Sequence, residues 1–597
     1  MSSFIGCYHF DSSGNEEFNS FRSRNKSSVY REWLSSDNRC WLAITQIENT
    51  TIPIDSLEFT SSSCGRFHIC FIGDIHNHLE IRRGLRFENW LGLDPAETIA
   101  EGLAQRGPAL LLEMRGSFSF AAYDKDKQQL LLSRDRFGIK PLYFFWKKNI
   151  LLFSTDRQKL SLGKTLARQS ICNILSFGHD FAPVDFPKSF SSSISALPSG
   201  MVVRFNHSRP HDSVRYWPPQ PRPDWSPLPI YRKNWAHTFL RQKIEEVVDQ
   251  NLCMNSPVAC LLSNDIYSYI LTAVASCLKK GSVSSFSIYL QDESYNQGQQ
   301  YSSLASYCGS SHHNLSISTD EALSWVEPAL TSMDVPNVHF FHKYFLSRSL
   351  ADQSVEIALS GLGADSLFGL SPQHRNVSIL MAMQWIPEPL RRALIHIASP
   401  LLAKIISTSP KWDCEYLGLA MRRLTHDENF HPVDFPLTNW PLSPPNCITQ
   451  KWGQISWVDL FGYSLPTFLI DSISTPFCNR LEWRFPFFDH QLAEITLRMP
   501  QRFHGNGNKL LRNAFKDLFL PSSLLNSTNH ISLPMSIWTR GPLRQLCSTR
   551  LEILKTTGIV DSSFIEQIWR AFELRQISWR CIWSLVILGE LARREFN

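Results

Sequence analysis

The chain has 597 residues, of which 43% are hydrophobic and 19% are charged. A single hydrophobic core stops growing at about 250–300 residues, so this length predicts at least two domains, and the composition excludes long disordered regions. The net charge of +5 is spread along the chain without a Lys/Arg cluster, so we expect neither nucleic acid nor an anionic membrane as a partner.

Short runs of β-type composition alternate with turns over the first 205 residues. The runs are FHICFIGDI, SFSFAAYD, QQLLLSRD, PLYFFWKK and MVVRF. Helical patterns interrupt them at 97–105 and 156–162. This mixture predicts an α+β sandwich for residues 1–205.

Proline becomes frequent after residue 205. The residues are Pro210, Pro218, Pro219, Pro221, Pro223, Pro227 and Pro229. Because proline disfavours helix interiors and sheet ladders, we place an interdomain linker at 206–232.

From residue 233 to residue 597 the pattern changes to helices that alternate with apolar strands. Helical patterns cover 235–252, 267–278 and 300–307, and strand-like runs are PVACLLS, SVSSFSIYL and VEIALS. Strands separated by helices of this length predict a parallel sheet that is covered on both faces. Beyond about residue 375 the pattern is mainly helical.

The remaining global signals are negative. The 14 cysteines stand singly, without a C-x-x-C pair or a zinc spacing, which predicts reduced and mostly buried thiols. The sequence has no signal-peptide pattern and no uninterrupted run of about 20 apolar residues. We therefore expect a cytoplasmic protein without a membrane span.

Several motifs in the first domain carry a resemblance. The segments, in chain order, are FIGDIHNHLEIRRGL (71–85), LDPAETI (93–99), MRGSFSFAAYD (114–124), SRDRFGIKPLYFF (133–145), LPSG (197–200) and RYW (215–217). Together they resemble the class II glutamine amidotransferase domain of the asparagine synthetase B family. The resemblance implies an Ntn-hydrolase-like sandwich.

The same resemblance predicts that glutamine hydrolysis is absent. The family places a cysteine nucleophile after the initiator Met and an asparagine oxyanion donor in F-N-G-E, where this chain has Ser2 and Ile72. Isoleucine has no donor, and the substrate-holding R-G-P-D segment is not found. We interpret Cys7 as a structural thiol, and Arg134, Asp135, Arg136 and Lys140 as residues that fix a turn rather than catalyse.

The second half resembles the ATP-pyrophosphatase (synthetase) domain of the same family, with a parallel α/β sheet and a helical C-terminal part. Its phosphate loop, S-G-G-x-D-S, corresponds to 263–268. Ser263 and Ser268 match the serines, which the resemblance assigns to ATP binding. Asn264 and Asp265 replace the glycines and Tyr267 replaces the aspartate, so we expect poor nucleotide binding, although Asp265 could instead reach a metal ion.

The segment ALSGLGADSLFGL (358–370) closely resembles ALSGEGADELFGGY of the family. Ser360, Gly361 and Gly363 match positions beside the nucleotide, and Asp365 matches a magnesium ligand. Leu362 stands at the position of a residue that assists proton removal, which leucine cannot do. A second interpretation is that this glycine-rich segment only packs a strand end.

Two further segments complete the resemblance. LEWRFPFFDHQLAEITLRMP (481–500) and NKLLRNAF (508–515) match family segments. They supply Glu482 and Lys509 as candidate catalytic residues, and the lysine would stabilise charge that develops in the transition state. The lysines of the following K-K-G-F segment are missing.

Three functions follow as hypotheses. The first is an ATP- and Mg-dependent carbon–nitrogen ligase without glutaminase activity, which joins a small-molecule or peptide carboxylate to an amine within the same substrate, as lasso-peptide cyclases do. The second is a catalytically inactive pseudoenzyme that serves as a binding or regulatory scaffold for a protein partner. The third, a glutamine-hydrolysing asparagine synthetase, must explain Ser2, Ile72, Tyr267 and Leu362 together.

Overall fold

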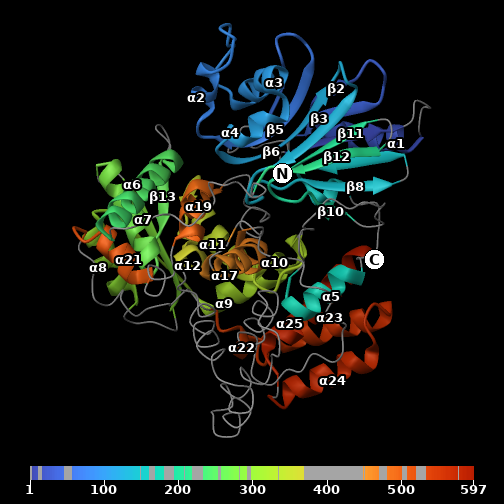
Figure 1. The fold of residues 1–597 in the computed structure, drawn as a ribbon. Helices are drawn as coiled ribbons and strands as arrows, with labels where there is room; N and C mark the ends of the chain where they lie inside the picture. Colours follow the sequence, from blue (N-terminus) through green and yellow to red (C-terminus); the bar gives the residue numbers. More distant parts are fainter. Residues whose placement is uncertain are drawn as a thin grey trace, which may run out of the picture. The chain divides into compact units, whose positions relative to one another are not determined.

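The computed structural model describes two compact units (Figure 1). The first comprises Met1–Ala167, Ala182–Arg222 and Pro476–Glu482, and the second comprises Arg168–Phe181, Pro223–Thr475 and Trp483–Asn597. The described residues are 3–10, 16–45, 57–147, 149–160, 168–179, 194–206, 209–217, 233–252, 257–280, 283–291, 297–333, 335–368, 448, 451–469, 481–499, 507–518, 533–575 and 577–596.

The first unit is a sandwich of two six-stranded sheets, with strand orders β10-β8-β9-β1-β3-β2 and β12-β11-β7-β6-β5-β4. The strands of the first sheet are β1 (Ser3–His9), β2 (Val29–Leu34), β3 (Cys40–Thr45), β8 (Tyr143–Lys147), β9 (Ile150–Ser154) and β10 (Ser195–Ala196). Those of the second are β4 (Leu57–Ser61), β5 (Phe67–Ile75), β6 (Gly116–Asp124), β7 (Gln129–Arg134), β11 (Met201–Asn206) and β12 (Arg209–Arg215). The predicted α+β sandwich is confirmed.

One hydrophobic cluster fills the space between these sheets. It takes Tyr8 and Phe144 from one sheet and Cys70, Tyr123 and Val203 from the other. Every residue of β1 and β3 is buried, so apolar side chains point to both faces of these strands. Burial on both faces removes the alternation of polar and apolar residues that marks a strand in the sequence.

Helices lie on the outer faces of the sandwich. They are α1 (Glu16–Asn25), η1 (Lys26–Ser28), α2 (His78–Arg83), α3 (Pro95–Arg106), η2 (Gly107–Ala109), α4 (Leu110–Glu113) and η3 (Arg157–Leu160). Helix α3 packs on β4 and β5, and Figure 1 shows it beside β5. It begins two residues before the predicted 97–105 helix because the Asp94 side chain caps it and Pro95 occupies its first turn. Of the predicted 156–162 helix, the described residues up to 160 contain the short 3-10 helix η3, and residues 161–162 lie outside the described residues.

Two segments fall on the other side of the predicted domain limits. Strand β12 lies within the predicted 206–232 linker, and it pairs with β11 at the edge of the second sheet. An edge strand tolerates Pro210, which donates no ladder hydrogen bond. Helix α5 (Arg168–Phe177), which lies within the predicted 1–205 domain, belongs to the second unit and packs against α25 (Trp579–Phe596).

The second unit is built on a five-stranded sheet of order β15-β14-β13-β16-β17. Its strands are β13 (Val258–Leu261), β14 (Ser284–Leu290), β15 (Ser311–Ile317), β16 (Ile357–Leu359) and β17 (Glu482–Arg484). Strand β13 pairs in parallel with β14 and β16, and β14 pairs in parallel with β15. The predicted parallel sheet is confirmed.

Helices make up most of the rest of the second unit. Those between the strands are α6 (Lys233–Asn251), α7 (Ile266–Leu278), α8 (Gln297–Cys308), α9 (Thr319–Ser324), α10 (Val326–Ser332), α11 (Phe340–Ala351) and α12 (Ala364–Phe368). The later ones are α17 (Lys451–Asp459), the π-helix η6 (Leu460–Leu469), η7 (Pro486–Phe488), α19 (His490–Arg498), α21 (Gly507–Ala514), α22 (Met535–Trp538), α23 (Arg544–Thr557), α24 (Ser562–Glu573) and α25. The helical C-terminal part was predicted.

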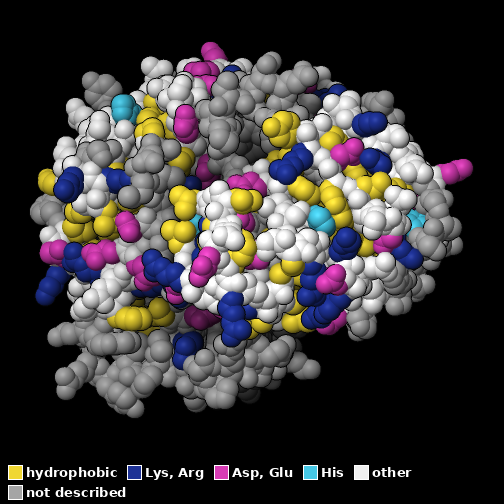
Figure 2. All heavy atoms as spheres, turned by 90° about the horizontal axis from the view of Figure 1, so that it is seen from above, with side chains coloured by type: hydrophobic (Ala, Val, Ile, Leu, Met, Phe, Trp, Pro, Cys, Tyr) yellow, Lys and Arg dark blue, Asp and Glu magenta, His cyan; other side chains and the backbone are white. Residues whose placement is uncertain are grey.

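Three global findings concern the described residues. None of their cysteines forms a disulfide, and most are buried. None of their helices combines the length and the apolarity that a membrane crossing requires. On the face drawn in Figure 2, Lys and Arg side chains are interspersed with Asp and Glu.

Candidate functional site

The loop between β13 and α7 is organised around Asp265. Its carboxylate caps α7, because Oδ1 accepts the backbone N–H groups of Tyr267 at 2.9 Å and of Ser268 at 2.8 Å. Asp265 is only 7% exposed. A buried carboxylate at a helix N-terminus is favoured by the partial positive charge of that terminus.

The two serines of this loop also turn toward Asp265. The Ser268 hydroxyl donates to Asp265 Oδ2 at 3.0 Å, and the Ser263 hydroxyl donates to the same oxygen. The backbone N–H of Ser263 donates to Ser268 Oγ at 3.1 Å. The donors expected to hold phosphate are therefore engaged by a side chain of the loop itself.

Tyr267 fills the space between this loop and the next one. Its ring is buried, stacks on Phe368 with centroids 6.3 Å apart, and meets Phe487 edge-on at 6.3 Å. Burial raises the pKa of the phenol, and the neighbouring carboxylates of Asp365 and Asp265 raise it further. The phenol therefore stays neutral beside Asp365.

The glycine-rich segment follows β16, the strand next to β13. Parallel strands end at the same edge of a sheet, so the two loops meet there. A Cβ atom at Gly361 would lie 3.2 Å from the backbone nitrogen of Ser268 and 3.4 Å from Tyr267 Cβ, which shows how closely the loops approach. Gly363 has φ +92°, a conformation that favours glycine.

Hydrogen bonds tie this second loop to its surroundings. The backbone N–H of Ser360 donates to the carbonyl of Arg484 on β17 at 3.0 Å. Ser366, in α12, donates to Asp459 Oδ2 at 2.6 Å and lies 2.6 Å from the Ser464 hydroxyl of the π-helix η6. These buried contacts fix the helix that carries Asp365.

Most of the site residues predicted for the second unit lie close together in the structure. The exception is Lys509, whose side chain lies outside the described residues. Ser263, Ser268, Gly361 and Asp365 lie at the meeting edge of β13 and β16, together with Ser360 and Gly363. Glu482 lies on β17, the strand beside β16. Lys509 belongs to α21.

In the first unit, the positions predicted to matter for glutamine hydrolysis are Ser2 and Ile72. Ile72, on β5, is 7% exposed and belongs to the core cluster. Ser2 lies outside the described residues, and Ser3 is buried with its hydroxyl 2.8 Å from Thr45 Oγ1. No side-chain donor occupies position 72 for an oxyanion.

The charged turn after β7 is held by its own backbone. Asp135 accepts the N–H groups of Phe137 at 3.0 Å, Ile139 at 3.0 Å and Lys140 at 2.9 Å, and Arg134 donates to the Lys140 carbonyl at 2.8 Å. Burial raises the pKa of Asp135. These contacts agree with the predicted architectural role.

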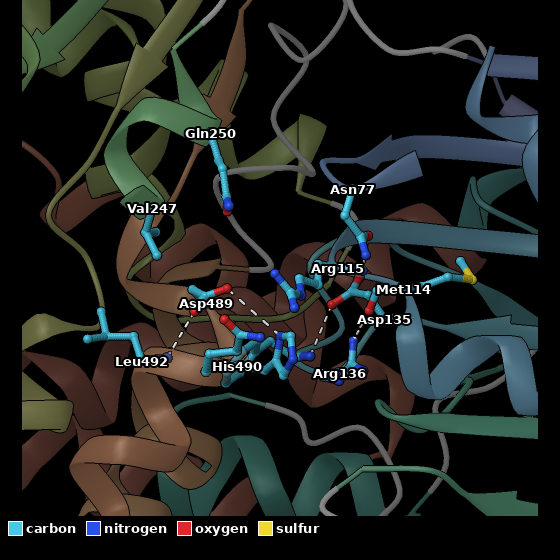
Figure 3. A network of polar contacts seen from close by, with 12 residues as sticks. Asn77, Met114, Arg115, Asp135, Arg136, Val247, Gln250, Asp489, His490 and Leu492 are labelled. Atoms are coloured by element: carbon cyan, nitrogen blue, oxygen red, sulfur yellow. Dashed lines mark hydrogen bonds and ion pairs between the residues drawn. The ribbon is translucent and has the colours of Figure 1, made fainter. Parts of the chain in front are cut away.

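Arginine 136 extends the same turn. Its guanidinium donates to the carbonyl of Met114, and nearby the Arg115 N–H donates to Asn77 Oδ1 at 2.9 Å (Figure 3). These contacts of Asn77, Met114, Arg115 and Arg136 join backbone segments within the first unit.

Comparisons with known proteins give a family for both halves. A family model described as asparagine synthase matches residues 240–593, and one described as a glutamine amidotransferase domain matches residues 38–217. The chain belongs to the asparagine synthetase family. Its synthetase-like part is thus the second unit with the parallel sheet, and its amidotransferase-like part is the sandwich.

Individual relatives of this family are similar at low identity. The chain is 22% identical to asparagine synthetase (glutamine-hydrolysing) 1 of Bacillus subtilis, over 88% of this chain and 84% of the relative. It is 24% identical to a putative asparagine synthetase (glutamine-hydrolysing) of Mycobacterium tuberculosis, over 76% and 71%. It is 21% identical to the amidase chry2 of Gibberella zeae, over 90% and 87%.

The family uses ATP, which its phosphate loop binds. The loop keeps the two serines and the helix N-terminus, but their donors are directed at Asp265, and Tyr267 fills the space beside Asp365. With these side chains in place the loop does not fit a pyrophosphate group.

Sequence reasoning recognised the change at Asp265 but missed its role. An aspartate directly before a helix is a strong N-cap signal, and this signal could have indicated that the carboxylate turns back onto the loop. The alternative prediction, that Asp265 reaches a metal ion, does not account for the four donors that surround it.

Proposed function

We propose that this chain has lost both catalytic activities of its family and keeps the fold as a binding or regulatory module that acts on a protein partner. The observation that carries this proposal is the Asp265 carboxylate, which takes up the donors of the phosphate loop. Leu362 adds support, because it cannot accept a proton from an attacking amine.

The loss of glutamine hydrolysis rests on the first unit. Ile72 gives the core a hydrophobic side chain where an oxyanion donor is needed, and Ser2 replaces the cysteine nucleophile. We expect the purified chain to release no glutamate from glutamine above the level of a heat-denatured sample. Release that disappears in Ser2→Ala would contradict this part of the proposal.

The loss of nucleotide use rests on the second unit. Titration calorimetry of the full chain with Mg-ATP is expected to give no saturable heat. Tight binding, or ATP–pyrophosphate exchange with any carboxylate tested, would overturn the proposal and favour a ligase.

A second candidate is the carbon–nitrogen ligase, which would activate a carboxylate and join it to an amine of the same substrate. It is favoured by Asp365 beside the sheet edge and by Glu482 on the neighbouring strand. In such an enzyme Asp365 would bind magnesium, and Lys509 would stabilise developing charge.

The ligase predicts exchange that depends on Lys509. Lys509→Ala would abolish ATP–pyrophosphate exchange, whereas Lys516→Ala, at an exposed position just after α21, would leave it unchanged. Peptide and small-molecule carboxylates are the substrates to test. Exchange that survives in Lys509→Ala would contradict the assigned role.

A further inference from the structure

We propose that Asp265 and Tyr267 are internal substitutes for the two ionic parts of a magnesium pyrophosphate group. In this proposal the Asp265 carboxylate takes the place of the pyrophosphate anion, and the Tyr267 ring takes up the space of the cation near Asp365. The inference deepens the proposed function and rests on it, because it states how the loop keeps its shape without nucleotide.

The first step concerns the anion. Phosphate is bound at a helix N-terminus by backbone N–H groups and hydroxyls that converge on its oxygens. Asp265 receives two backbone N–H groups, from Tyr267 and Ser268, and two hydroxyls, from Ser263 and Ser268. Its carboxylate thus takes the donor set that such an anion would use.

Ordinary capping does not account for this donor set. Three other helices of the described chain begin with a capping aspartate, namely α3 with Asp94, α19 with Asp489 and α24 with Asp561. Asp94 and Asp489 each accept one backbone N–H at their helix, and Asp561 accepts the N–H of Phe564 and the hydroxyl of Ser563. Asp265 accepts two backbone N–H groups and two serine hydroxyls, and it is only 7% exposed.

The second step concerns the cation. Asp365, in α12, matches the position of a family magnesium ligand. The Tyr267 ring is buried and packs against Phe368 of the same helix and against Phe487, and its hydroxyl makes no hydrogen bond within the described part of the chain. In this proposal the ring takes the place of a hydrated ion.

The test measures the binding of inorganic pyrophosphate to full-length variants by calorimetry, with and without Mg²⁺. Asp265→Asn keeps a capping side chain and removes the charge, and Asp265→Gly removes both. We expect each to bind pyrophosphate about tenfold or more tightly than the wild type, since a carboxylate and a phosphate at about 4 Å repel even in a high dielectric. In Asp265→Gly/Tyr267→Asp the binding should become dependent on Mg²⁺.

Asp561→Asn is the matched control, because it alters the same kind of cap on α24. It should leave pyrophosphate binding at the wild-type level. Equal affinities of the wild type and both Asp265 variants would overturn the role of Asp265. Gain of binding in Asp265→Gly without Mg²⁺ dependence in the double variant would overturn the role of Tyr267.

These results can be told apart from a failure of the proposed function. The proposed function fails when the wild type itself binds Mg-ATP tightly or catalyses exchange. The inference on Asp265 fails when its removal changes nothing. Circular dichroism of each variant confirms that the comparison is made between folded proteins.

Discussion

At the residue scale, the loop between β13 and α7 differs from an anion-binding loop in the charge and the size of two of its side chains. The negatively charged side chain of Asp265 accepts the backbone N–H groups of Tyr267 and Ser268. The aromatic ring of Tyr267 lies near the Asp365 carboxylate. Glycine at position 265 would have left room for a ligand to approach the backbone. In the proposed function, the side chains of Asp265 and Tyr267 together prevent a phosphate ligand from entering the loop. Helix α7, which follows the loop, keeps its N-terminal cap.

A prediction at this scale concerns Asp94, which caps α3 in the first unit. Desolvation raises the pKa of its carboxyl from 3.8 to about 6, so the folded state keeps a proton that the unfolded chain has lost. Stability from this group is highest below about pH 4 and falls as the pH rises to about 6. Asp94→Asn keeps the cap and removes the titration.

The measurement is the difference in thermal midpoint between Asp94→Asn and the wild type. This difference should become more positive between pH 4 and pH 7. Asp561→Asn provides the opposite case, because hydrogen bonds from Ser563 and Phe564 lower the pKa of that carboxyl. A difference for Asp94→Asn that does not change with pH would contradict the prediction.

At the element scale, the C-terminal helices α23 and α25 are held by a close approach and by buried charge. A Cβ atom at Gly589 would lie 2.2 Å from the Arg550 carbonyl oxygen, so glycine is required there. Glu590 is 0% exposed and accepts Arg550 Nε at 2.7 Å and Arg593 Nη2 at 2.7 Å. The helices thus pack around the buried pair of Arg550 and Glu590, while Arg593 is partly exposed.

This cluster predicts unequal effects of two conservative changes. Glu590→Gln leaves the buried Arg550 without its main counter-charge and is expected to cost about 3–5 kcal/mol of unfolding free energy. The other partner of Arg550 is Glu327, whose side chain is 66% exposed. Glu327→Gln should therefore lower the unfolding free energy by only about 0–1 kcal/mol. Urea unfolding followed by tryptophan fluorescence measures both, and equal effects would contradict the prediction.

Helices and strands with long apolar or periodic runs could be predicted from the sequence, and others could not. Strands β5, β6 and β7 and helices α6 and α7 follow from long apolar or periodic runs, and the structure has them close to the expected limits. Strand β15 was missed because its residues, with two histidines and an asparagine, are those of a partly exposed edge strand. Strand β12 was missed because prolines dominate that part of the sequence.

At the scale of the whole molecule, the fold and the chemistry of the family depend on different sets of positions. Both family domains are present, since many apolar positions specify each core. Few polar positions specify the chemistry, and the changed ones include Ser2, Ile72, Asp265 and Tyr267. The roles predicted for the site residues of the second unit stay predictions. The inward turn of Asp265 could not be predicted, because it depends on contacts that only the folded loop provides.

A prediction for the whole molecule follows from the linkage between binding and stability. A ligand that binds only the folded state raises the unfolding free energy, by about 2.7 kcal/mol at a hundredfold excess over its dissociation constant, and therefore raises the thermal midpoint. We expect millimolar Mg-ATP to leave the midpoint of the wild-type chain unchanged, because the donors of the phosphate loop are already engaged. A clear upward shift, absent with Mg²⁺ alone, would contradict this expectation.

The covalent attachment of Asp265 to its own loop has a further consequence. A tethered group meets its partners at an effective concentration on the order of millimolar even when the tether is flexible. Any free phosphate compound must compete with a ligand that cannot diffuse away. In the proposed function, this loop would respond less to changes in the cellular nucleotide concentration than a loop whose donors are not engaged by its own side chain.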